Sequence, residues 1–180
     1  MTYTAAFQEM LGLDPLACRD EDLPRTAERE KLSLGSSWDQ QSRDDWLNLL
    51  FAECVQPRLG HGRPVIVTHY PASQAALAAV CPDDPRASER YELFVGGVEL
   101  ANGYHELLDA EQLAIRSGEV LRQRRSDGKP DLMVDNRLLA AMHAGMPDSC
   151  GCALGVDRLV MLALNLSSID EVLPFTIERA

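Results

Sequence analysis

Two short runs of strand-forming residues around a glycine pair constrain the fold of this 180-residue chain more than any other feature. The first run is Tyr91–Val95 and the second is Val98–Asn102, with only Gly96 and Gly97 between them. Adjacent glycines between two such runs are typical of a β-hairpin with a tight turn. We therefore expect the chain to contain an antiparallel sheet.

Further elements extend this hairpin into a fold that mixes strands and helices. β-Branched residues predict a strand over 64–70, and alternating small and apolar residues predict another over 151–156. Apolar spacing and runs of helix formers predict helices over 1–11, 23–34, 43–55, 108–125 and 135–145. The pattern indicates an α+β fold, an antiparallel β-sheet flanked by helices.

Four polar residues that can bind cations lie in or just after the hairpin: Glu92, Glu99, Asn102 and Glu106. The turn can set Glu92 and Glu99 side by side across the two strands, in a register that the sequence does not fix. A buried carboxylate is unfavourable unless a positive group meets it. A divalent cation, which prefers oxygen ligands, and a substrate ammonium group are two candidates for that positive group. The alternative is a half-exposed sheet whose glutamates face water.

The stretch Gly151–Leu164 predicts a short strand that runs into a helix. We expect Asp157 to cap the helix, because a short carboxylate accepts hydrogen bonds from the free amides of the first turn. Arg158 follows at a place where helix N-termini favour anions, which suits it to a phosphate group. The alternative is a buried strand packed on a helix, with Arg158 in an ordinary ion pair.

Composition narrows the class of protein. The chain has 46% hydrophobic residues, enough to build a core as one domain or as part of a larger one. A formal net charge of -11 argues against a dedicated nucleic-acid-binding module. Five scattered cysteines favour a reducing, cytoplasmic setting over a disulfide framework, and their spacing argues against structural zinc. Neither a signal peptide nor a membrane-spanning run is expected.

Two motifs together carry a resemblance to a known family. The run Arg90–Leu107 and the run Gly151–Met161, which contains Gly-x-Asp-Arg, resemble the catalytic domain of class II aminoacyl-tRNA synthetases of the lysyl subgroup. The resemblance is closer to the paralogous family that attaches β-lysine to elongation factor P, on three features: the run His69–Ala75, His105, and Ala153 in place of a glycine. It covers essentially residues 1–180, but only about the C-terminal half of a typical member.

The resemblance implies roles for individual residues. It implies that Arg158 and Glu99 are catalytic and that the metal ligands are Glu92 and Glu99. It implies ATP-binding positions at Glu99, Leu100, Gly155 and Arg158, and substrate-binding positions at Asn102, Glu106 and Ala153. Glu106 matches the carboxylate that receives the side-chain ammonium of a lysine-type substrate, and Arg158 matches the arginine on the γ-phosphate.

The implied reaction needs ATP and Mg²⁺ and activates lysine or (R)-β-lysine as an aminoacyl-adenylate. The aminoacyl group then passes to a lysine of elongation factor P; tRNA is the alternative acceptor, as in a lysyl-tRNA synthetase. The resemblance also implies a homodimer at full length. No membrane partner is expected, because no apolar run is long enough to span a bilayer.

One departure from the family separates the alternatives. The first and second motifs of the family should precede Met1, and neither occurs in this sequence. We expect the 180 residues alone to keep their fold with unpaired sheet edges and to be weak or inactive as a ligase. A truncated, non-catalytic synthetase-like module is the third interpretation.

Overall fold

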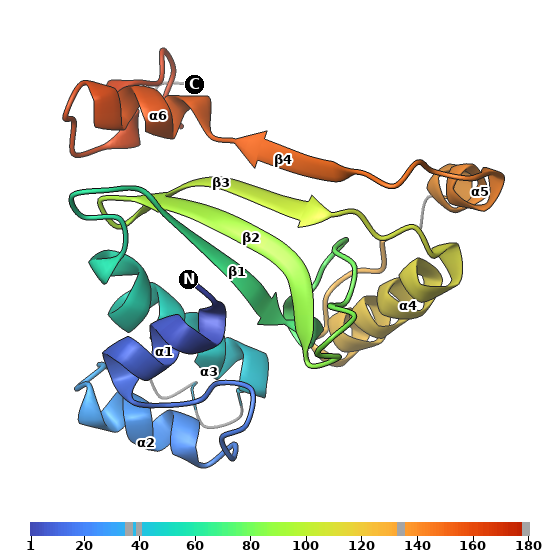
Figure 1. The fold of residues 1–180 in the computed structure, drawn as a ribbon, viewed down its shortest axis with the longest axis horizontal. Helices are drawn as coiled ribbons and strands as arrows, with labels where there is room; N and C mark the ends of the chain where they lie inside the picture. Colours follow the sequence, from blue (N-terminus) through green and yellow to red (C-terminus); the bar gives the residue numbers. More distant parts are fainter. Residues whose placement is uncertain (35–37, 39–40, 133–135, 178–180) are drawn as a thin grey trace.

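The computed structural model describes residues 1–34, 38, 41–132 and 136–177, which form a four-stranded antiparallel sheet with helices around it (Figure 1). The strands follow one another in the sheet in chain order: β1 (Val65–Pro71), β2 (Ala87–Val95), β3 (Val98–His105) and β4 (Cys150–Leu154). The predicted α+β fold and the predicted hairpin are confirmed. Gly96 and Gly97 form its turn with φ angles of 56° and 78°, a conformation that glycine adopts without steric cost.

The helices fall into three groups along the chain. α1, α2 and α3 precede the sheet, α4 and α5 lie between β3 and β4, and α6 follows β4. Their bounds are Tyr3–Leu11, Asp22–Arg29, Arg43–Leu50, Ala110–Ser126, Asn136–Ala144 and Val156–Ala163.

The observed helix bounds agree with the predicted ones in part. The second helix ends at Arg29 instead of residue 34. α3 continues through Phe51–Val55 as a wider π-helical turn, so the predicted length there is confirmed. The predicted start of the fifth helix, residue 135, lies outside the described residues. Within the described ranges, no helix is both long and apolar enough to cross a bilayer.

An aromatic cluster joins the N-terminal helices to the sheet. Tyr3 and Phe7 of α1 and Phe51 after α3 pack against Tyr70 of β1 and Phe94 of β2, and all five are buried. The ring centroids of Tyr3 and Phe51 are 5.2 Å apart, and those of Phe51 and Phe94 are 5.7 Å apart. Such pairs add about 0.5–1.5 kcal/mol each beyond the area they bury. The core therefore sits over β1 and β2.

The other end of the sheet is open. Within the described residues, β4 pairs with β3 alone, so its outer edge has no strand partner. Apolar side chains at the end of β4, in α6 and directly after it are exposed, among them Leu154, Val156, Leu159, Val160 and Leu164. Figure 1 shows β4 and α6 on the side of the sheet away from α1–α3.

The hairpin register differs from the prediction. The turn pairs Val95 with Val98, so Glu92 and Glu99 are never opposite each other. Because Leu93 pairs with Ala101 and Phe94 with Glu99, Leu100 is an extra residue on β3, a β-bulge. The bulge shifts the pairing by one residue beyond it and sets Glu92 opposite Asn102. The expected side-by-side placement of Glu92 and Glu99 was therefore wrong.

Gly103 lies at the centre of the sheet, where close packing leaves no room for a side chain. A Cβ atom there would lie 2.3 Å from Cζ of Tyr91 and 2.5 Å from the carbonyl oxygen of Gly151, which is backbone and cannot swing away. We expect Gly103→Ala to lower the free energy of unfolding by roughly 1–3 kcal/mol or more. The measurement is urea-induced unfolding followed by circular dichroism.

Gly118→Ala is the matched control, because a Cβ at this position in α4 would have no neighbour within 4 Å. Alanine there should raise stability by roughly 0.4–1 kcal/mol through helix propensity. Equal effects of the two substitutions would contradict the close packing of β2, β3 and β4.

Candidate functional site

The predicted site residues of the sheet gather on one of its faces, here called the carboxylate face. Glu92, Asn102 and Ala153 are register partners across β2, β3 and β4, so their side chains point to the same side. Glu99 pairs with Phe94, which alternates with Glu92 on β2 and so shares its face. Glu106 continues the face past the end of β3 and bridges to Ala78.

Glu92 is buried, 7% exposed, and its charge is neutralised within the protein. Oε1 accepts hydrogen bonds from Arg90 Nη2 at 2.5 Å and from Asn102 Nδ2 at 3.2 Å, and Oε2 accepts one from the Tyr70 hydroxyl at 2.7 Å. Burial, and next the Glu92 carboxylate, raise the pKa of Tyr70, so its hydroxyl keeps the proton that it donates. The Glu92 carboxylate is thus held rigidly by three donors.

Asn102 has an unused acceptor. Its Nδ2 donates to Glu92, while its Oδ1 is buried and has no hydrogen-bond partner within the described part of the chain. A buried polar atom without a partner is rare in folded proteins, and an unfilled ligand site is one cause of it. Asn102 Oδ1 is therefore suited to accept a hydrogen bond from an ammonium group.

Glu106 lies against a glycine. A Cβ on Gly151 would come within 2.2 Å of Glu106 Oε1, so the absence of a side chain at Gly151 makes room for this carboxylate. The backbone of Glu106 is fixed by its N–H, which donates to the carbonyl oxygen of Ser149 at 3.0 Å. Ala153, two residues along β4 from Gly151, is exposed on the same face beside Asn102.

Arg158 and Glu99 meet where α6 begins. Arg158 Nη1 donates to the Glu99 carbonyl oxygen at 2.9 Å and lies 3.3 Å from Glu99 Oε2. The two side chains are 45% and 32% exposed, so both charges remain accessible to a ligand. The Gly155 N–H donates to the carbonyl oxygen of the bulge residue Leu100 at 2.8 Å. This hydrogen bond ties the start of α6, which carries Arg158, to the part of β3 that carries Glu99.

The predicted cap of α6 was wrong. The N-cap is Gly155, with no capping side chain, and Asp157 lies within the first turn. The hydrogen bond from Gly155 to Leu100 accompanies a helix start two residues earlier than a cap at Asp157 would give. Asp157 still places a negative charge near the helix N-terminus, which favours the helix.

The two predicted magnesium ligands differ in how well they fit that role. Glu99 presents an accessible carboxylate oxygen, the type of ligand that Mg²⁺ takes. Glu92 already has three donors on its oxygens. Across the described residues, no three His, Cys, Asp or Glu side chains gather as a metal site. Mg²⁺ binding at Glu92 and Glu99 stays a prediction, and any further ligands would have to be phosphate oxygens or water.

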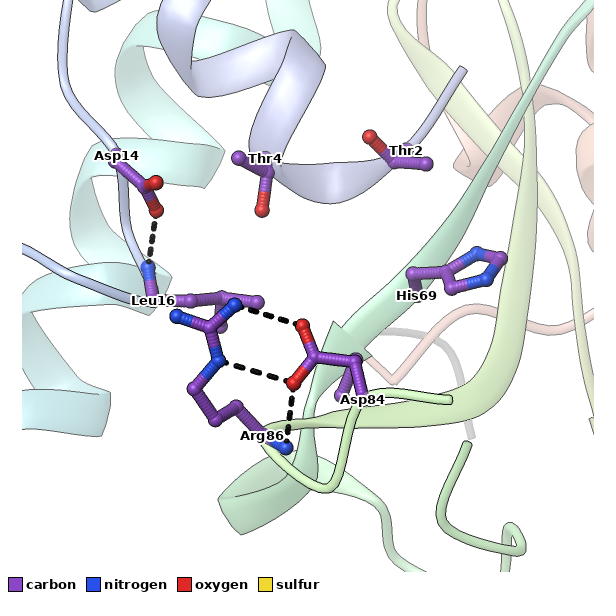
Figure 2. A pocket seen from close by; sticks show the side chains of 8 residues that line it. Thr2, Thr4, Asp14, Leu16, His69, Asp84 and Arg86 are labelled. Atoms are coloured by element: carbon purple, nitrogen blue, oxygen red, sulfur yellow. Dashed lines mark hydrogen bonds and ion pairs between the residues drawn. The ribbon is translucent and has the colours of Figure 1, made fainter. Parts of the chain in front are cut away.

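A separate polar cavity of about 250 Å³ lies between the start of α1 and the end of β1 (Figure 2). Asp84 and Arg86 form an ion pair there, and hydrogen bonds from Arg86 lower the pKa of Asp84 to about 2. His69, the first residue of the run His69–Ala75 that resembles the ligase family, lines this cavity. Its side chain is exposed and its backbone φ is 60°. None of the predicted site residues lines the cavity, which is formed by Thr2, Thr4, Asp14, Leu16, His69, Asp84, Arg86 and Ala87.

Sequence reasoning missed the residues that hold Glu92. Arg90 is two positions before Glu92 on the same strand, a spacing that places both on one face and was an available signal. Arg90 also donates to the Gln74 carbonyl oxygen at 2.9 Å and stacks 4.8 Å from the Tyr70 ring centroid. The role of Tyr70 depends on the pairing of β1 with β2, which no local pattern reveals.

Comparison with known proteins gives a consistent result. A family model described as tRNA synthetases class II (D, K and N) matches residues 1–179. Proteins named elongation factor P–(R)-beta-lysine ligase from Klebsiella pneumoniae (strain 342) and Haemophilus influenzae (strain PittGG) are 46% and 43% identical to the whole chain. One of the same name from Edwardsiella ictaluri is 46% identical. The chain spans 55% of the length of each.

Removing one donor from Glu92 should cost stability. We expect Tyr70→Phe to lower the free energy of unfolding by roughly 1–3 kcal/mol, because a buried carboxylate oxygen loses its partner. Tyr104→Phe is the control, because its hydroxyl has no hydrogen bond within the described ranges. Thermal unfolding of both variants measures the difference, and an unchanged Tyr70→Phe protein would contradict the assigned contact.

Proposed function

This chain belongs to the class II tRNA synthetases (D, K and N), and we propose that its carboxylate face is part of an ATP-dependent ligase site for a lysine-type amino acid. The placement of Glu106 supports this most directly. Its carboxylate occupies space that only a glycine at position 151 leaves free, on the same face as an unpaired amide oxygen on Asn102. A substrate with two ammonium groups matches a site that offers one carboxylate and one neutral acceptor.

At the amino-acid end of the proposed site, Glu106 and Asn102 bind different amino groups of the substrate. Glu106 receives the side-chain ammonium group through a charge-assisted hydrogen bond. Asn102 Oδ1 accepts a hydrogen bond from the second amino group, and the Glu92 carboxylate holds the amide in place from the other side. The methyl group of Ala153 lies beside Asn102 and narrows the floor of the pocket, which favours one position of the second amino group over another.

The nucleotide end of the proposed site is the junction of β3 and α6. Arg158 binds the phosphate tail of ATP, with Leu100 and Gly155 lining the nucleotide, and Glu99 is the accessible metal ligand. Mg²⁺, when bound, would neutralise phosphate charge. The contact of Arg158 with Glu99 keeps the guanidinium oriented before the phosphate arrives, an example of electrostatic preorganisation.

The proposed reaction has two steps. A carboxylate oxygen of the amino acid attacks the α-phosphorus of ATP, a new P–O bond forms, and pyrophosphate leaves. A lysine amine of the acceptor then attacks the acyl carbon, loses a proton, and releases AMP. The residues of this chain contribute mainly by positioning the reactants and neutralising charge.

The proposed acceptor is elongation factor P, because the related ligases carry that name and match the whole chain at 43–46% identity. The proposed amino acid is (R)-β-lysine for the same reason. We place this reaction in the cytoplasm, and the five free cysteines fit a reducing setting. The acceptor is tested with the protein in the longest form that its gene encodes, incubated with labelled amino acid, ATP and Mg²⁺. Label on elongation factor P is expected, and label on tRNA instead would contradict the proposal.

Two substitutions test the amino-acid pocket. Glu106→Gln removes the carboxylate charge, and Gly151→Ala keeps the charge but displaces Glu106 by steric contact. Both should weaken binding of β-lysine or lysine by roughly 10- to 100-fold, the loss of one charge-assisted hydrogen bond of about 1.5–3 kcal/mol. Affinity for ATP with Mg²⁺ should be unchanged, as measured by titration calorimetry.

Glu119→Gln is the matched control, because it neutralises an exposed glutamate on α4 that has only a long contact with Arg122, at 3.8 Å. It should leave both affinities unchanged. The assignment of Glu106 is wrong if either site variant loses ATP binding while the amino acid binds normally.

A further inference from the structure

His105 contacts a carboxylate with each of its two ring nitrogens. Nδ1 is hydrogen-bonded to Glu89 of β2, and Nε2 is hydrogen-bonded at 2.5 Å to Asp148, in the loop before β4. An ionised carboxylate only accepts hydrogen bonds, so both ring nitrogens must donate. This geometry requires the imidazolium form of His105. A neutral ring, with one N–H, can satisfy only one of the two carboxylates.

The loop that His105 holds is the same loop that fixes Glu106. Asp148 is next to Ser149, whose carbonyl oxygen accepts the backbone N–H of Glu106. Two residues later, Gly151 provides the space for the Glu106 carboxylate. Glu106 directly follows His105, the last residue of β3, and the two side chains point to opposite faces of the sheet. His105 can therefore influence Glu106 only through the backbone and the loop.

The charges around His105 make this contact sensitive to its protonation. The titratable groups that face the ring are Glu89 from β2, Asp148 from the loop and Cys150, its register partner on β4. Hydrogen bonds from the ring, first to Asp148 and then to Glu89, raise the pKa of His105 above its ordinary value. Asp148 has a 76% exposed side chain against 32% for Glu89, so its contact is the one expected to break on deprotonation.

We propose that the imidazolium of His105 is a positioning residue that clamps residues 146–149 and so holds Glu106 in place to receive the substrate ammonium. The identity of the ligand at Glu106 rests on the proposed function, but the clamp itself does not. It is favoured while the ring is charged. Because the folded pKa is raised, the clamp is complete below the ordinary histidine pKa and is lost as pH rises through the folded value.

Nuclear magnetic resonance tests the clamp without any ligand. The ring nitrogen shifts of His105 should titrate at a pH above the ordinary value, and the amide signals of Glu106 and Gly151 should change along the same curve. Asp148→Asn should shift that curve to lower pH. Asp131→Asn, which removes an exposed carboxylate from an ion pair with Arg125, is the control and should leave it unchanged.

Lysine binding supplies the functional readout. For the unchanged chain, affinity should fall by roughly 2- to 10-fold as pH rises through the His105 titration, the effect of about one hydrogen bond. In Asp148→Asn the fall should move to lower pH, and in His105→Gln affinity should be low at every pH. A structural role alone would lower affinity without moving the pH profile.

The results separate the two proposals. If the unchanged chain binds no lysine at any pH, the proposed function fails and the amide titration alone decides the clamp. If lysine binds with the same pH profile in Asp148→Asn as in the unchanged chain, or if the Glu106 and Gly151 amides do not follow His105, the clamp is wrong.

Discussion

The bulge at Leu100 is the constraint on which the site depends. Glu99 and Asn102 are three residues apart, so on a regular strand their side chains would point to opposite faces of the sheet. The extra residue shifts the alternation of side chains by one position, so that Glu99 and Asn102 lie on the same face. There Glu99 is paired across the strands with Phe94, and Asn102 with Glu92. It also directs the Leu100 carbonyl oxygen to the Gly155 N–H, which fixes the start of α6 and hence Arg158.

Charge is distributed on this face in two ways. Glu92 is buried among Arg90, Tyr70 and Asn102, which donate hydrogen bonds to its carboxylate. Glu92 therefore has a structural role, because removing one partner of a buried charged group strongly lowers stability. Glu106 and the Arg158–Glu99 pair remain accessible to a ligand. The aromatic core packs against β1 and β2 and anchors the supporting half of the face. The accessible half, on β3 and β4, is held by strand pairing and by the contacts of His105.

Local patterns in the sequence predicted the hairpin, the strand-to-helix junction and most helices, because glycine pairs and apolar spacing act over a few residues. The placement of Glu92 beside Glu99 failed because the two-residue turn pairs Val95 with Val98 and so puts Phe94 opposite Glu99. The pairing of Glu92 with Asn102 depends on the bulge, which has no clear signal in a single sequence. The cap at Asp157 failed because a contact with Leu100, far away in the chain, sets where α6 begins. The contacts of Tyr70 with Glu92 and of His105 with its two partners join segments that are distant in the chain, which spacing alone does not reveal.

The central claim is that the carboxylate face of β3 and β4 binds the amino acid. Mapping amide chemical shifts of the isotope-labelled chain during titration with β-lysine tests it most directly. The account predicts that the largest changes lie at Asn102, Glu106, Gly151 and Ala153. Changes centred instead on the cavity around His69 and Arg86, or no changes at saturating ligand, would contradict it.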